Sequence, residues 1–224
     1  GGDQSSTSAV SFRMPRVATA SSATVVVFGD QGTIQPLGLA IAKQVSRFCG
    51  VTYPSEAKQS GAGSPTPCDA VHVVGDLAYA WHSVTIGPEE EWLWDLYQQE
   101  QQWYSASVPM MATPGNHEGF DNQIAFRSRF RMPGPESGGN GNIWYSYNVG
   151  PIHFTSISTD NAYDVGSPQY QWLQADLAAA ANNATRSRRP WIVVLTHRPM
   201  YSSDSFEYAQ HIPGAPIQKT LEPL

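Results

Sequence analysis

Four short motifs with metal-ligand side chains follow one another along this sequence. They are Gly29-Asp30-Gln31-Gly32, Gly75-Asp76-Leu77-Ala78-Tyr79, Gly115-Asn116-His117-Glu118 and Val194-Leu195-Thr196-His197. Three of them directly follow an apolar run that is typical of a buried strand. Because an α/β sheet collects the loops after its strands at one edge, we expect these side chains to converge on a dinuclear metal site.

The two aspartates are the strongest part of this pattern. Asp30 and Asp76 each follow a strand-like run and a glycine, which lets the backbone turn tightly and brings the carboxylate close to an ion. A single aspartate of this kind is more often a helix N-cap, but its repetition favours a metal site. A carboxylate has two oxygens and can bridge two cations, so we predict that one of the pair does so.

Tyr79 adds a less common ligand type. It stands three residues after Asp76, so one turn can direct both side chains into one site. A free phenol has a pKa of about 10, and a phenolate near neutral pH therefore needs a strongly acidic metal. Trivalent iron is such a metal. Without its place after Gly-Asp, Tyr79 would be interpreted as a packing aromatic residue.

The remaining donors are neutral. Asn116 offers an amide oxygen, and His117 beside it allows one side chain to serve the metal and the other the substrate. His197 ends a strand-like run, and a neutral imidazole there suits a divalent ion. For His72 and His153, which lie within predicted strands, we expect ordinary packing.

The elements that must position these motifs alternate between strands and helices, which predicts mixed α/β architecture. We expect strands over residues 24–28, 70–74, 108–112, 143–149, 152–158 and 191–196, and a short additional one over residues 10–15. We expect helices over residues 36–48, 88–104, 124–130 and 167–181, and from residue 216 onward. Ser167 is the expected N-cap of the fourth helix, with Pro168 at its first position.

Composition indicates one sizeable globular domain. The chain has 224 residues, of which 41% are hydrophobic, and a formal net charge of −6. A protein that binds the phosphate backbone of nucleic acids is usually basic, so the charge argues against that function. The longest apolar runs, such as residues 191–195, have the length of a strand and do not reach that of a membrane span.

Cysteine usage bears on the compartment. Cys49 and Cys68 do not form a Cys-x-x-Cys pair, which argues against zinc-finger chemistry. They flank a loop rich in Ser, Gly and Pro over residues 52–67, so we expect a disulfide bond, with two free core thiols as the alternative. Asn183 begins an Asn-x-Thr sequon, which matters only in a secretory compartment.

With these motifs, the chain resembles a purple acid phosphatase of the metallophosphoesterase superfamily, which is also called calcineurin-like. The resemblance covers nearly all of the chain after residue 23 and includes Gln169-Tyr170-Gln171-Trp172-Leu173. Two details favour the purple branch: the first motif reads Asp-Gln-Gly instead of Asp-x-His, and the second carries Tyr79.

The resemblance implies an α/β fold, a mixed-sheet β-sandwich flanked by helices. Residues 1–23 would be the tail of an upstream fibronectin-like module plus a linker, and residues 24–224 the catalytic domain. The expected centre holds Fe(III) and a divalent Zn, Mn or Fe ion, and the expected activity is acid phosphatase, with a metal-bound hydroxide attacking a phosphomonoester. In this resemblance Asp30 and Tyr79 would bind the ferric ion, and Asp76 would bridge both metals. Asn116 and His197 would bind the divalent ion. His117 would contact the substrate phosphate and donate a proton to the leaving group.

Some features depart from the family pattern. The Gly-His-x-His motif, which supplies one histidine to each metal, would follow shortly after Leu224, so we expect a chain truncated at both ends and inactive until a C-terminal segment completes the site. The family often has a second substrate-binding histidine shortly after His197, but residues 204–207 contain none, and the nearest histidine to that position is His211. His82, which follows Tyr79, is a candidate to hydrogen-bond to the metal ligands.

Two other readings therefore stay open. One is a metal-dependent phosphodiesterase or nucleotide pyrophosphatase, whose pocket the Gly-rich residues 134–142 would shape. The other is a non-catalytic metal-binding fragment. The expected partners are small phosphorylated substrates, with neither nucleic acid nor membrane and with a homodimer left open. The expected location is secreted, vacuolar or lysosomal.

Overall fold

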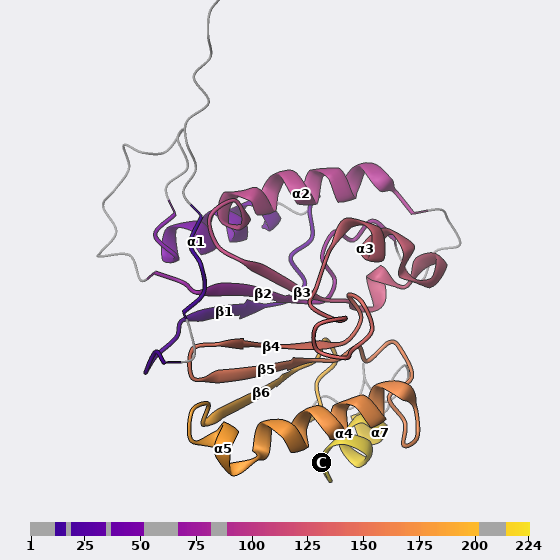
Figure 1. The fold of residues 1–224 in the computed structure, drawn as a ribbon. Helices are drawn as coiled ribbons and strands as arrows, with labels where there is room; N and C mark the ends of the chain where they lie inside the picture. Colours follow the sequence, from indigo (N-terminus) through magenta and orange to yellow (C-terminus); the bar gives the residue numbers. More distant parts are fainter. Residues whose placement is uncertain (1–11, 17–18, 35–36, 52–66, 82–88, 202–213) are drawn as a thin grey trace, which may run out of the picture.

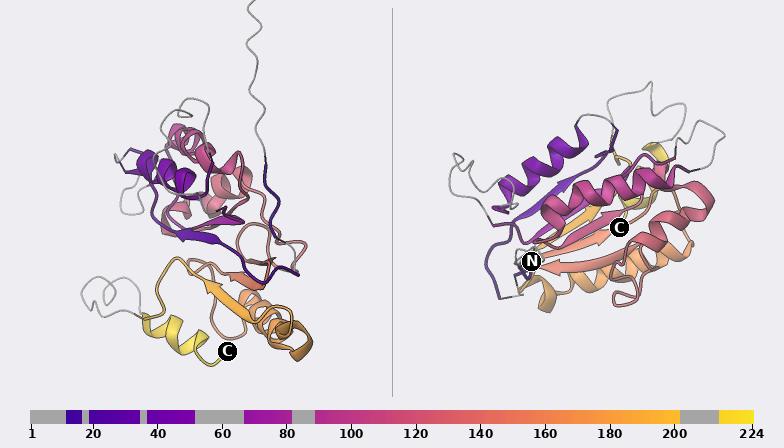
Figure 2. Two further views of the ribbon diagram at one scale, coloured as in Figure 1. Left: turned by 90° about the vertical axis from the view of Figure 1, so that its left-hand side faces the viewer. Right: turned by 90° about the horizontal axis from the view of Figure 1, so that it is seen from above.

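The computed structural model describes residues 12–16, 19–34, 37–51, 67–81, 89–201 and 214–224. Two three-stranded sheets pack face to face, and helices cover the outer face of each, which gives four layers (Figure 1). In the left view of Figure 2 the two sheets lie as separate layers between the helices. This arrangement confirms the predicted fold class, a mixed-sheet sandwich flanked by helices.

The first sheet is parallel and has the order β1-β2-β3, with β1 (Val25–Phe28), β2 (Ala70–Val74) and β3 (Met110–Thr113). The central strand is covered on both sides and is correspondingly apolar except for His72. Parallel pairing requires crossover connections, and these are helical. All three strands thus present their carboxyl ends at one edge.

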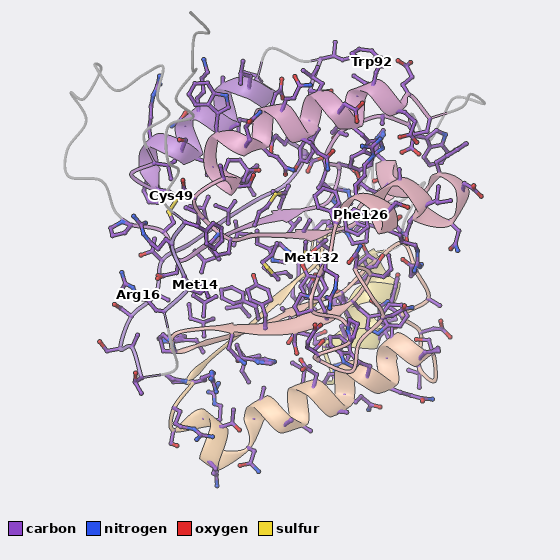
Figure 3. All side chains as sticks on the ribbon, turned by 45° about the horizontal axis from the view of Figure 1, so that its top comes forward. Met14, Arg16, Cys49, Trp92, Phe126 and Met132 are labelled. Carbon is purple, nitrogen blue, oxygen red and sulfur yellow. A yellow bond between two sulfur atoms is a disulfide. The ribbon has the colours of Figure 1, made fainter. Side chains whose placement is uncertain are left out.

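Three helices cover the outer face of this sheet: α1 (Gly38–Phe48), α2 (Glu91–Ser105) and α3 (Ile124–Arg129). Their inner faces form the largest apolar cluster, in which Phe126 is fully buried. Figure 3 shows Phe126 toward the interior, whereas Trp92 on the outer side of α2 is 55% exposed. This apolar packing fixes the helices against the sheet and thereby positions the loops that join the helices to the strands.

The second sheet is mixed. The hairpin of β4 (Tyr145–Val149) and β5 (Ile152–Ser156) is antiparallel, and β6 (Trp191–Leu195) pairs parallel to β5. Residues of both sheets, including Ala70 and Phe154, meet in a small apolar cluster between the layers. The carboxyl end of β6 consequently lies at the same edge as those of β1 to β3.

The outer face of the second sheet carries α4 (Pro168–Ala181), α5 (Asn183–Arg186) and α7 (Gly214–Leu221). The Ser167 side chain caps α4 by accepting from the backbone N–H of Tyr170 at 3.2 Å, as expected. The sequon residue Asn183 is exposed at the start of α5. Among the described residues, none of the helices combines the length and apolar character that a bilayer crossing requires.

The strand expected over residues 10–15 is wrong for its described part, because residues 12–15 contain no strand. The Arg13 backbone N–H donates to the carbonyl of Ser107 at 2.8 Å, and the Gly150 N–H donates to the carbonyl of Arg16 at 3.0 Å, so separate bonds attach the segment without a strand ladder. The residues 10 and 11 lie outside the described chain. The other expected elements are present, with ends shifted by one to three residues where they are described.

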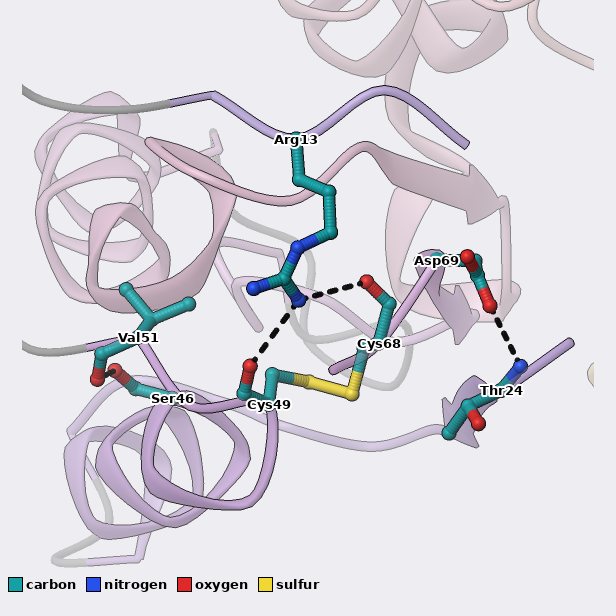
Figure 4. The surroundings of a disulfide bond; sticks show 7 residues. All are labelled: Arg13, Thr24, Ser46, Cys49, Val51, Cys68 and Asp69. Carbon is teal, nitrogen blue, oxygen red and sulfur yellow. Dashed lines mark hydrogen bonds between the residues drawn. A yellow bond between two sulfur atoms is a disulfide. The ribbon is translucent and has the colours of Figure 1, made fainter. Parts of the chain in front are cut away.

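Cys49 and Cys68 form the expected disulfide bond, with a Cα–Cα distance of 4.8 Å. Cys49 caps the end of α1 and Cys68 precedes β2, so the bond ties this helix to the central strand (Figure 4). The Arg13 guanidinium donates to the carbonyls of both cysteines. Closing a loop of this size stabilises the fold by about 3 kcal/mol in the chain-entropy account.

A chain of polar contacts crosses the interior between the sheets. The two ring nitrogens of His72 lie 2.8 Å from Tyr147 Oη and 2.7 Å from Thr113 Oγ1, and Thr113 Oγ1 lies 2.7 Å from Ser156 Oγ. Burial lowers the pKa of His72 from 6.5 to about 3. His72 was expected to be an ordinary packing residue, but it is a neutral hydrogen-bonding link between the two layers.

We predict that His72 makes the fold sensitive to acid. Between pH 6.5 and about 3 the unfolded chain binds a proton at His72 that the folded chain does not, so stability falls as the pH drops through 6.5. The loss amounts to about 2 kcal/mol at pH 5. Urea denaturation of the metal-free protein at pH 7.5 and pH 5 should show a smaller loss for His72→Gln. Tyr147→Phe, which removes a hydrogen bond but keeps the imidazole, should retain the loss. An equal loss of unfolding free energy between pH 7.5 and pH 5 in the wild type and both variants would contradict the assignment.

Candidate metal centre

The loops after β1, β2, β3 and β6 meet at one edge of the sandwich. Asp30, Asp76 and His197 each place one ligand atom within 4.8 Å of the others. Tyr79 Oη lies 2.9 Å from Asp30 Oδ1, and Asn116 Oδ1 lies 3.1 Å from His197 Nε2. The structure thus brings together all five side chains that the sequence nominated as metal ligands.

The backbone of this edge is strained where the candidate ligands stand. Asp30, Asp76 and Tyr79 have positive φ angles of 55°, 52° and 52°, a region that costs a non-glycine residue about 1–2 kcal/mol. Backbone hydrogen bonds hold the first two loops together, from Asp30 N to Gly75 O and from Gly32 N to Leu77 O. Such strain persists only where the surrounding structure enforces it, and it concentrates at functional sites.

Two glycines allow the donors to approach one another. A Cβ on Gly75 would lie 2.4 Å from His197 Nδ1, and a Cβ on Gly115 would lie 2.4 Å from Asp76 Oδ1. Both distances are far below van der Waals contact. Glycine at these positions is therefore a requirement of the side chains packed against it.

The geometry around His197 suits a metal ligand. Its Nδ1 lies 2.9 Å from the carbonyl oxygen of Val74, which can only accept, so Nδ1 carries the hydrogen and Nε2 presents a lone pair in the neutral ring. That lone pair faces Asn116 Oδ1 at 3.1 Å and Asp76 Oδ1 at 3.4 Å. A positive charge among these three groups, supplied by a bound metal ion or by a proton on Nε2, would relieve their mutual repulsion.

Tyr79 completes the opposite side of the cluster. Its hydroxyl donates to Asp30, and burial together with the charges of Asp76 and Asp30 raises its pKa far above the ordinary value of 10. The phenol thus keeps its proton beside two carboxylates. Among the described residues, no lysine or arginine forms an ion pair with either carboxylate. The donor set, two carboxylates with a phenol, an amide and an imidazole, fits two hard or borderline cations.

His117 faces the same cluster from the 3₁₀ turn η2 (Asn116–Glu118). Its Nδ1 donates to the carbonyl of Trp81 at 2.6 Å, and its Nε2 lies 3.8 Å from Asp76 Oδ2. The ring packs against Tyr79 with a centroid distance of 4.3 Å. His117 therefore lies beside the cluster of candidate ligands, and its role toward a substrate stays a prediction. His82 and His211 lie outside the described residues.

Glu118 belongs to the site although the sequence analysis gave it no role. It is buried, and its carboxylate accepts from the backbone N–H groups of Gly115, Asp76 and Leu77 at 2.7–2.9 Å. Burial and the charge of Asp76 raise its pKa to about 8, while the three N–H groups oppose the rise. One side chain thus joins the second and third motifs. The only signal in the sequence was its place next to His117.

We predict that Glu118→Gln loosens this edge. An amide nitrogen cannot accept, so at least one of the three backbone N–H groups is left unpaired, which should lower the free energy of unfolding by about 2 kcal/mol. The affinity for metal should fall about tenfold or more. Urea denaturation and metal titration measure the two effects. Glu100→Gln, at a buried glutamate on α2, is the matched control and should leave metal affinity unchanged; an equal loss in both variants would refute the role.

Known proteins with this combination of sequence and fold are phosphatases by name. Acid phosphatase type 7 of Danio rerio is 38% identical over 185 residues, covering 80% of this chain and 36% of the relative. Purple acid phosphatase 18 of Arabidopsis thaliana is 36% identical over 162 residues, covering 69% of this chain and 34% of the relative. The chain thus spans about a third of the length of the curated relatives it matches.

A solved structure shares the fold. Purple acid phosphatase PPD1 from yellow lupin seeds superposes with a TM-score of 0.65 at 22% identity, over 90% of this chain and 35% of that one. The sequence itself matches the calcineurin-like phosphoesterase family over residues 45–219, which include three of the four motifs. The chain therefore belongs to the calcineurin-like phosphoesterase family.

Proposed function

We propose that the protein containing this chain is an acid phosphatase of the purple type, which hydrolyses phosphomonoesters at a dinuclear metal centre. The observation that carries the proposal is the cluster of Asp30, Asp76 and His197, whose ligand atoms lie within 4.8 Å of one another. Membership of the family implies a dinuclear metal centre, and relatives named acid phosphatase support the reaction.

The donor chemistry supports one distribution of the metals. The Asp30 carboxylate and the Tyr79 oxygen, once a strongly acidic metal displaces the phenol proton, would suit Fe(III), whereas Asn116 and His197 offer neutral donors that suit divalent Zn, Mn or Fe. Asp76, which lies between the two groups, would bridge. When bound, such a centre supplies an activated nucleophile and positive charge opposite the phosphate oxygens. Each ion would have three of these donors, with Asp76 shared, and further donors would complete its coordination.

The chain's own residues would orient the substrate and move the proton. The Trp81 carbonyl fixes the imidazole of His117 with the hydrogen on Nδ1, and Tyr79 packs against the ring. The Asp76 carboxylate accepts from the His117 backbone N–H at 3.0 Å, so the turn and the ligand hold each other in position. His117 Nε2 would then contact the phosphate and deliver a proton to the leaving oxygen.

The covalent chemistry supports an oxidising compartment. Disulfide bonds persist mainly in oxidising compartments, so the bond between Cys49 and Cys68 supports a secreted, vacuolar or lysosomal protein. The exposed position of Asn183 suits glycosylation there.

We predict phosphomonoesterase activity that depends on the metals and on Asp76. The full-length protein, loaded with iron and zinc, should hydrolyse phenyl phosphate faster than bis(4-nitrophenyl) phosphate, and chelation should abolish both reactions. Asp76→Asn should lower kcat/KM at least about a hundredfold, because a charged bridging group is lost. Asp176→Asn is the matched control, since this carboxylate binds His153 on the outer side of the second sheet, away from the centre. Faster hydrolysis of the diester would favour the phosphodiesterase reading.

Tyr79 provides a separate test of the ferric site. Charge transfer from a phenolate to Fe(III) absorbs visible light, so the oxidised, loaded protein should be purple. Tyr79→Phe should lose this band while the protein still folds. Tyr97→Phe, at a fully buried tyrosine of α2, should keep it. A band that survives in Tyr79→Phe would remove Tyr79 from the ligand set.

A further inference from the structure

A pocket of about 350 Å³ lies beside the proposed centre. Asn116 forms part of its wall and also lies 3.1 Å from His197, so the pocket and the cluster share a boundary. Trp81 forms another part, and its carbonyl holds His117. Asn116 and Trp81 thus connect the pocket to the cluster and to the residue that orients His117, which makes it a candidate site for the group released from phosphate.

Fixed amide groups supply the polar surface of the pocket. Asn161 Oδ1 accepts from Gln123 Nε2 at 3.0 Å and from Ser158 Oγ at 2.7 Å. Because both bonds end on Oδ1, they fix the orientation of the Asn161 amide and leave Nδ2 as its donor group. No described residue accepts a hydrogen bond from that Nδ2. Asn122, which is exposed, lines the same pocket. Amides donate and accept hydrogen bonds without carrying charge, which matches hydroxyl groups.

The segment that carries two of these amides is held in a strained conformation. In the turn η3 (Phe120–Gln123), Asp121, Asn122 and Gln123 have φ angles of 42°, 56° and 64°. Gln123 is 3% exposed, and its Oε1 has no hydrogen-bond partner among the described residues. Three successive left-handed residues are costly, so the turn is enforced by its surroundings at the pocket wall.

The described lining residues of the pocket include no unpaired positive charge. Asp160 is the one charged side chain among the described lining residues, and Arg198 neutralises it with a contact of 2.6 Å. A leaving group that carried a phosphate of its own would meet no unpaired cation among these described residues. It would also approach a paired carboxylate in a chain with a net charge of −6. A neutral leaving group meets no such penalty.

We propose that this pocket receives the leaving group of the substrate and selects phosphomonoesters of neutral, polyhydroxylated alcohols, such as sugar phosphates, over substrates whose leaving group bears further phosphate. Hydroxyl groups would pair with the amides of Asn161 and Asn122, and the apolar face of a sugar ring would pack on the Trp81 indole. The inference rests on the proposed phosphomonoesterase activity for its catalytic meaning.

Removing the negative charge of Asp160 tests whether the charges beside the pocket set the substrate preference. Asp160→Asn leaves the Arg198 charge unpaired beside the pocket, so it should improve kcat/KM for glucose 1,6-bisphosphate relative to glucose 6-phosphate by about fivefold. The full-length, metal-loaded wild type should prefer glucose 6-phosphate by about tenfold. Asp95→Asn on α2 makes the same change in net charge away from the pocket, where Arg129 of α3 keeps Glu91 as a second partner, and it should leave the ratio unaltered. A wild-type preference for the bisphosphate, or a ratio that Asp160→Asn does not change, would overturn the proposal.

Binding of free glucose to the metal-free protein separates this inference from the catalytic one. Tryptophan fluorescence or NMR titration should detect glucose binding to the wild type and about tenfold weaker binding to Asn161→Asp, which replaces the Nδ2 donor by an oxygen. Asn182→Asp, at the exposed cap of α5, is the control. If glucose binds in this way but no phosphomonoester is hydrolysed, the proposed function fails and the pocket assignment stands. If phosphomonoesters are hydrolysed but glucose does not bind, or binds equally to Asn161→Asp, the pocket assignment fails.

Discussion

The hydrogen bond from His197 to the carbonyl of Val74 is the contact on which the candidate site depends, because it joins the two sheets at their functional edge. It connects the end of β6 in one sheet to the end of β2 in the other, and it needs Gly75 because a Cβ there would overlap the imidazole. The same bond places the hydrogen on Nδ1 and so directs the Nε2 lone pair toward Asp76 and Asn116. Sheet packing, ring tautomer and ligand geometry are thus set together.

The interior behind this edge is more polar than a sandwich core needs to be. His72, Thr113 and Ser156 form hydrogen bonds across the layers, and the apolar cluster between the sheets is small. Hydrogen bonds have a preferred direction and hydrophobic contacts do not, so a polar link fixes the register of one sheet on the other. The cost is that His72 must remain neutral, which connects the stability of the fold to pH.

A single short turn performs several tasks at the site. In η2, Asn116 meets His197, His117 faces the cluster, and Glu118 binds the backbone of the loop after β2. Trp81 extends this arrangement, since its carbonyl orients His117 while the residue lines the neighbouring pocket. A shift of this turn would therefore alter the proposed metal ligand, proton donor and leaving-group pocket at the same time.

The sequence by itself determined the local features: the strand-end motifs, the cap at Ser167 and the alternation of strands and helices, because turn chemistry and apolar periodicity act over a few residues. The strand expected before β1 is wrong for its described residues, because isolated bonds to Ser107 and Gly150 attach this segment where a ladder was expected. Only the tertiary structure decided the role of Glu118, the tautomer of His197 and the paired charge of Asp160. Each of these depends on a contact between residues far apart in the chain, such as the 123 positions between Val74 and His197, and the distance between them exists only after the two sheets have packed.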